Sequence, residues 1–129
     1  MFRIALSLLL SITISFAEIE WISSLKKAKE ISLQTKKPIL IFVATKTCPY
    51  CIEMKSTVLT DRDVVSYISN NFVPFLLYPS TGQFPKNANI EGVPTLMFYD
   101  AQEKKLAPNI VGLIEKDELL ENLKGLNLK

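Results

Sequence analysis

The chain has 129 residues, 48% of them hydrophobic, which is enough for one globular domain with a core but too short for two. Lysine and arginine together number 15 and acidic residues 13, a near balance that gives no indication of a nucleic-acid partner. Because the chain contains no histidine, cysteine–histidine hydrolases and c-type haem attachment are excluded.

The first 17 residues predict a secretory signal peptide. Arg3 precedes an apolar run over residues 4–14, and a small-x-small pattern ends at Ala17, directly before Glu18. The run is shorter than the ~20 residues that span a bilayer, which favours a cleaved leader over a retained membrane anchor. We therefore expect a signal peptide at 1–17, a single domain at 18–129 and export of the mature chain.

Apolar side chains at helical spacing predict a first helix over residues 21–36, whose inward face consists of Trp21, Ile22, Leu25, Ala28 and Leu33. Residues 38–44 contain no polar side chain, and such a run is typical of a central strand buried on both faces. A second helix is expected to begin at Cys48 and to run to about Leu59.

The remaining elements complete an α/β pattern. Thr60 and Asp63 form a capping-box signal for a third helix, whose buried face comprises Val64, Ile68 and Phe72. A strand at 72–79, an irregular loop at 80–91, a hairpin of strands 95–100 and 106–111, and a helix at 116–124 follow. This order predicts a mixed central β-sheet flanked by helices.

The two cysteines, Cys48 and Cys51, are the only ones in the chain. A closed zinc site needs four ligands, so we expect no metal site unless two chains share one. A structural disulfide is an alternative, although a loop of four residues gains only about 2 kcal/mol from closure.

A redox role accounts for the position of the pair between a buried strand and a helix. Cys48 is expected at the N-cap with Pro49 at the first helical position, where proline is favoured. The backbone N–H of Cys51 can then point at the Cys48 sulfur, and the helix terminus stabilises a thiolate there. Cys48 is therefore the predicted attacking sulfur and Cys51 the predicted resolving thiol.

The strand, the CPYC motif and the helix together resemble the thioredoxin superfamily. The stretch EGVPT at 91–95 is similar to the family's cis-proline loop, so the resemblance places Val93 and Pro94 against the cysteines and predicts a cis peptide bond before Pro94. It covers about residues 21–124. The segments TVLTDRDVVSYISNNFVPFLL, VPTLMFYDAQEK and IVGLIEKDELLENL are most similar to the C-terminal periplasmic domain of DsbD-type proteins and its stand-alone relatives.

The resemblance implies a thioredoxin fold, a periplasmic location and thiol:disulfide exchange with protein substrates, without a bound cofactor. Pro49 and Tyr50 are expected to support the site. Reduction is the expected direction, with electrons supplied by a membrane thiol-reductant conductor, and the protein is expected to act as a monomer. An oxidant or isomerase, and a non-catalytic binding module with a structural disulfide, remain as alternatives.

Two positions depart from the family's pattern. Phe42 stands six residues before Cys48, where thioredoxin-like enzymes often carry a buried carboxylate, and Thr47 replaces the tryptophan that precedes thioredoxin's motif. The sequence therefore does not identify the base that deprotonates Cys51; Glu53, Lys55 and water are the candidates.

Overall fold

The computed structural model describes residues 18–128. The predicted signal peptide at 1–17 lies outside these residues. Within residues 18–128, no helix is both long enough and apolar enough to cross a membrane.

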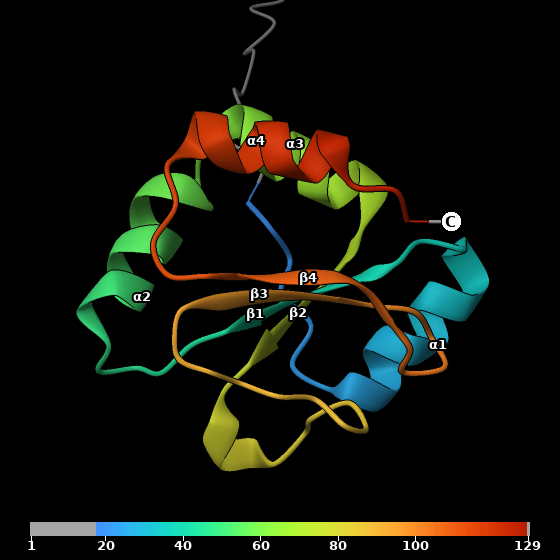
Figure 1. Ribbon diagram of the computed structural model, residues 1–129. Coiled ribbons are helices and arrows are strands. Elements are labelled where there is room, and N and C mark those ends of the chain that lie inside the picture. The colour runs from blue at the N-terminus through green and yellow to red at the C-terminus, as the bar shows by residue number, and fades with distance from the viewer. Residues whose placement is uncertain (1–17, 129) are drawn as a thin grey trace, which may run out of the picture.

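The described chain folds into helices around one sheet, as Figure 1 shows. The elements are, in chain order, α1 (Leu25–Thr35), β1 (Ile39–Val43), α2 (Pro49–Glu53), the π-helical segment η1 (Met54–Val58), α3 (Arg62–Asn71), β2 (Val73–Leu77), the 3-10 turn η2 (Pro79–Thr81), β3 (Thr95–Tyr99), β4 (Lys105–Val111) and α4 (Lys116–Gly125). The predicted order of helices and strands is confirmed.

The sheet is mixed and has the strand order β2-β1-β3-β4. β1 pairs in parallel with β2, and it pairs antiparallel with β3, where Val43 lies opposite Thr95. β3 and β4 form the predicted hairpin. This pairing places the end of β1, which leads to the cysteines, beside the start of β3, which follows Pro94.

Side chains of the two central strands alternate between two core layers. Leu40 and Phe42 pack in a cluster with residues of α2, α3 and α4, whereas Ile41 and Val43 pack with α1 and the loop after β2. Every residue of β1 is buried, as its apolar sequence predicts. Full burial of one such side chain stabilises the fold by about 1.5–3 kcal/mol. The sheet is therefore covered by helices on both faces, as expected.

The first helix is shorter than predicted. It begins at Leu25, because the Ser24 side chain accepts the backbone N–H of Lys27 and caps the helix. Ile22 instead forms a parallel bridge with Phe75 at the edge of β2. Leu33, expected on the inward face, is 59% exposed, so that prediction was wrong.

The third helix and the end of the second also differ in detail from the prediction. Asp61, not Thr60, caps α3, because its carboxylate accepts the N–H groups of both Asp63 and Val64. The second helix does continue to Leu59, but its last part is the π-helical segment η1, in which the N–H of Leu59 donates to the carbonyl of Met54.

Candidate active site

Cys48 is the N-cap of α2. Its sulfur accepts the backbone N–H of Cys51 at 3.2 Å, and Pro49 occupies the first turn, both as predicted. The carbonyl of Cys48 also accepts the N–H of Ile52 at 3.0 Å, which begins the helical hydrogen-bond pattern. A sulfur in this position faces the helix N-terminus, where unpaired N–H groups and the dipole favour negative charge.

Cys51 lies one turn further into α2 and is only 2% exposed, whereas Cys48 is partly exposed. Burial, followed by hydrogen bonding to the Cys48 side chain, raises the pKa of Cys51 from 9.0 to about 11, although a backbone hydrogen bond at Thr45 acts in the opposite direction. The charge of Cys48 contributes a further, smaller increase to that pKa. The two thiols therefore differ in access, and the position of Cys51 in the helix raises the pKa of that thiol.

The loop that ends at Pro94 lies against Cys48. The peptide bond between Val93 and Pro94 is cis, as predicted, and the Cys48 thiol donates to the Val93 carbonyl oxygen at 3.9 Å. Pro94 is buried, and its own carbonyl accepts the N–H of Gly112 at 2.8 Å. The structure thus brings together two segments that are 45 residues apart in the sequence.

Exposed apolar side chains lie on α2 and on the segment around Gly112, whose N–H bonds the Pro94 carbonyl. Tyr50 and Ile52 on α2 are 61% and 54% exposed, and Val111 and Leu113, on either side of Gly112, are 51% and 40% exposed. Tyr50 was predicted from the sequence, whereas the segment around Gly112 was not. Its one available signal is the glycine itself, whose φ of 92° lies in a region that other residues rarely adopt.

No carboxylate occupies the core position ahead of the motif. Phe42 is fully buried there, in the same cluster as Cys51, and its ring lies 5.6 Å from that of Trp21. Glu53 and Lys55 are exposed. The ammonium group of Lys46, two residues before Cys48, lies 5.4 Å from the centre of the Tyr78 ring. Among residues 18–128, no three side chains of the His, Cys, Asp and Glu types gather into a metal site.

A family model described as a thioredoxin-like domain matches residues 25–127, which include both cysteines and Pro94. The chain belongs to the thioredoxin-like domain family. No curated protein matches its sequence.

Solved structures with the same fold include three that span most of the chain. A thioredoxin from Thermus thermophilus is 20% identical, with a TM-score of 0.70 and coverage of 84% of this chain and 86% of its own. The DsbH oxidoreductase is 24% identical, with a TM-score of 0.65 and coverage of 90% of each chain. The C-terminal domain of DsbD from Neisseria meningitidis is 18% identical, with a TM-score of 0.64 and coverage of 83% and 99%. At these identities the likeness establishes the thioredoxin fold.

Proposed function

We propose that this protein is an exported thiol:disulfide oxidoreductase that acts on protein substrates through Cys48 and Cys51. The observation that carries the proposal is the hydrogen bond from the Cys51 N–H to the Cys48 sulfur at the start of α2. This bond stabilises a thiolate at a sulfur that solvent and substrates can reach.

In the first step, the Cys48 thiolate attacks one sulfur of a client disulfide. A bond forms between Cys48 and that sulfur, the client disulfide breaks, and the second client sulfur leaves as a thiolate that takes a proton from water. The product is a mixed disulfide between Cys48 and the client. Its formation removes the negative charge from Cys48.

In the second step, Cys51 gives its proton to water and attacks the Cys48 sulfur as a thiolate. The mixed disulfide breaks, the client leaves with two reduced sulfurs, and Cys48 and Cys51 become a disulfide. Burial and the Cys48 side chain keep the pKa of Cys51 near 11 before the reaction. Once Cys48 is bonded to a client, the contribution of its charge is lost, so Cys51 becomes easier to deprotonate after the mixed disulfide has formed.

The surface around the cysteines supports a protein client. Val93 offers its backbone beside Cys48, next to buried Pro94. The exposed apolar side chains of Tyr50, Val111 and Leu113 provide contact area for a client segment that holds its disulfide over Cys48. Pro49 contributes by starting α2, which positions both sulfurs.

Insulin reduction tests whether the pair is catalytic. With a dithiol donor, the wild type should accelerate precipitation of the insulin B chain, and Cys48→Ser should abolish the acceleration. Ser56→Ala, an exposed change in η1 outside the site, is the control and should retain full activity. A wild type without activity in either direction of exchange would favour the binding module with a structural disulfide.

Reduction is the proposed direction, with electrons from a membrane thiol-reductant conductor. Lys46 is the one positively charged side chain close in sequence to Cys48, and its ammonium group lies over the Tyr78 ring. We therefore expect a weak oxidant, with a potential of roughly −200 to −230 mV, well below the ~−120 mV of DsbA. Acid-trapped thiol labelling in cells should find the pair mostly reduced. A mostly oxidised pair with a potential above about −150 mV would show that the protein is an oxidant.

A further inference from the structure

Thr95, the first residue of β3, has a hydroxyl group in a fully buried position. Among residues 18–128, the one other buried side chain of the serine, threonine, amide or charged types is that of Ser32. Burial of a hydroxyl is unfavourable unless it forms a hydrogen bond, and a valine of nearly the same shape would fill the position without that need. The hydroxyl of Thr95 therefore calls for a reason other than packing.

The hydroxyl of Thr95 closes the turn that contains Val93 and Pro94. It donates to the backbone carbonyl of Gly92 at 2.6 Å. Within the described part of the chain, no backbone N–H donates to that carbonyl. The side chain of Thr95 thus takes the place of the backbone N–H that closes an ordinary turn. The N–H of Gly112 holds the turn from the other side, through the Pro94 carbonyl at 2.8 Å.

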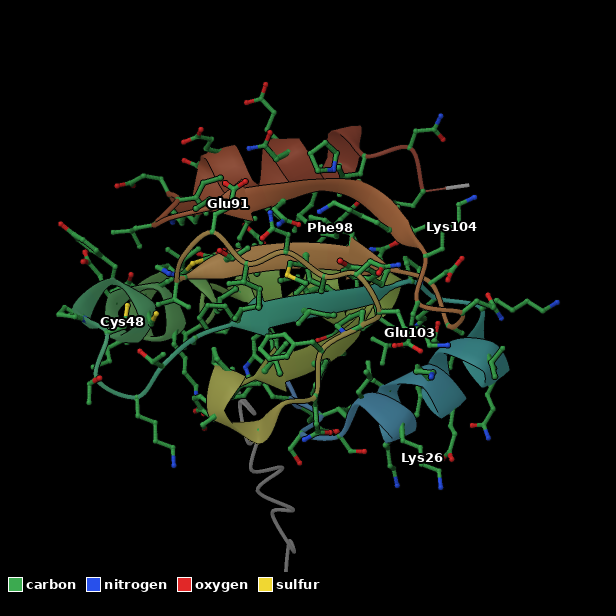
Figure 2. The ribbon with its side chains drawn as sticks, turned by 60° about the horizontal axis from the view of Figure 1, so that its bottom comes forward. Lys26, Cys48, Glu91, Phe98, Glu103 and Lys104 are labelled. Carbon is green, nitrogen blue, oxygen red and sulfur yellow. The ribbon has the colours of Figure 1, made fainter. Side chains whose placement is uncertain are left out.

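The backbone of Thr95 is itself held by the sheet. It lies opposite Val43 at the end of β1 and opposite Val111 at the end of β4, so strands flank it on both sides. Figure 2 shows Glu91, the residue before this turn, on the same side of the molecule as Cys48, with Lys104 at the opposite end. Thr95 is therefore a fixed point from which a side chain can hold the turn next to the cysteines.

The turn presents the Val93 carbonyl to Cys48. The Cys48 thiol donates to this carbonyl at 3.9 Å, and no backbone N–H of residues 18–128 does so. A thiolate, or a sulfur in a mixed disulfide, has no proton to donate. The Val93 carbonyl consequently loses its partner when Cys48 reacts, and a backbone N–H of the client beside the attacked sulfur can replace it.

We propose that Thr95 is a positioning residue for client reduction, whose hydroxyl holds residues 92–95 so that the Val93 carbonyl accepts a backbone N–H of the client. The proposal rests on the redox function proposed above and adds that clients are recognised through the backbone next to their disulfide. A small disulfide that has no peptide group cannot form this bond. Thr95 should therefore affect the reaction with protein clients and not the reaction with such a reagent.

Single-turnover oxidation of the reduced protein tests this distinction, with insulin as one oxidant and bis(2-hydroxyethyl) disulfide as the other. Thr95→Val keeps the shape and removes the hydroxyl. It should lower the second-order rate constant with insulin by roughly tenfold, because a misplaced contact group loses orientation of the client. The rate constant with the small disulfide, and the alkylation rate of Cys48, should stay at the wild-type values. Thr95→Ser, which retains the hydroxyl, should restore the reaction with insulin.

Ser32→Ala is the matched control. The Ser32 hydroxyl is also buried and donates to a backbone carbonyl, that of Lys37, at 2.6 Å. Ser32 lines a pocket together with Lys104, at the end of the molecule opposite Cys48. Loss of this bond should lower stability and leave the rate constants with both disulfides unchanged.

Three results would overturn the role of Thr95: a wild-type rate of Thr95→Val with insulin, an equal loss with both disulfides, or an equal loss in Thr95→Ser. If Thr95→Val does not fold, Thr95→Ala and Thr95→Ser make the same comparison, because they differ only in the hydroxyl. A wild type that reacts with neither disulfide would instead refute the redox function itself, so the two failures are distinguishable.

Discussion

The backbone N–H of Cys51 donates to the Cys48 sulfur at 3.2 Å. Cys51, which is assigned the second attack, therefore also positions the sulfur that makes the first attack. The same pair differs sharply in burial, because Cys51 is 2% exposed and Cys48 is partly exposed. The relationship predicts different reactivities for two thiols that lie within one turn of helix.

Alkylation of the reduced protein should modify Cys48 first. With the pKa of Cys51 near 11, only about one Cys51 in a thousand is a thiolate at about pH 8, and burial further limits access. Iodoacetamide labelling followed by peptide mass spectrometry measures both rates. The Cys51 rate should increase only as the pH approaches that pKa. Equal rates at every pH would indicate an inert structural pair.

Cys51→Ala should accumulate mixed disulfides with client proteins. The variant retains the exposed sulfur at the helix start but lacks the thiol that releases the client, so the product of the first step persists. Non-reducing electrophoresis of acid-quenched cells measures the accumulation. Cys48→Ala serves as the control and should form no such species. Comparable adducts through Cys51 in that control would reverse the assigned roles.

Phe42 should contribute mainly to stability. Its side chain is fully buried, so Phe42→Ala should lower the free energy of unfolding by about 3–5 kcal/mol, and Phe42→Leu by about 1 kcal/mol. Urea unfolding followed by the fluorescence of Trp21, whose ring contacts Phe42, measures both. Tyr50→Ala, at a 61% exposed position, should change the unfolding free energy by less than about 0.5 kcal/mol. A small effect of Phe42→Ala would contradict the packing described for the core.

Glu103 should stabilise the fold only when it is ionised. A hydrogen bond from Lys29 at 3.0 Å, and a further one from the Lys86 N–H, hold its pKa below the usual value. The folded carboxylate therefore contributes stability above the unfolded pKa, and the contribution is lost as the pH falls through the folded pKa. Because the pair is partly solvated, we expect Glu103→Gln to cost no more than about 1 kcal/mol at neutral pH and nothing in acid.

Urea unfolding at neutral pH and at about pH 3 measures this difference. Glu30→Gln, on the exposed side of α1, is the control and should show little change at either pH. A cost for Glu103→Gln that persists in acid would mean that shape or backbone conformation, and not charge, determines the role of Glu103.

The sheet and the start of α2 were predictable because local sequence determines them. The unbroken apolar run of β1 specifies a buried strand, and Cys48 followed by Pro49 specifies a helix start. The exposure of Leu33 and the bridge between Ile22 and Phe75 were not predicted, since helical periodicity does not show which face meets the sheet or where an edge strand is free to pair.

The candidate site was only partly predictable for a related reason. Pro94 could be placed beside Cys48 from the resemblance to thioredoxins. Val111 and Leu113 join the site because β4 pairs with β3 and the Gly112 N–H bonds the Pro94 carbonyl. Such a contact depends on the register of two strands, which no short motif encodes.

The π-helical segment η1 determines the direction in which the cysteine-bearing turn of the helix faces relative to the residues after it. The bond from the Leu59 N–H to the Met54 carbonyl spans five residues, so this turn holds one more residue than an α-helical turn would. Deleting exposed Ser56 would remove that extra residue and rotate the two parts of the helix relative to each other by about 100°. The side chains of Met54 and Cys51 and those of Val58 and Leu59 could then no longer all face the core. The deletion should therefore abolish insulin reduction although it alters no residue in contact with either sulfur, whereas full activity would show that the helix tolerates either phase.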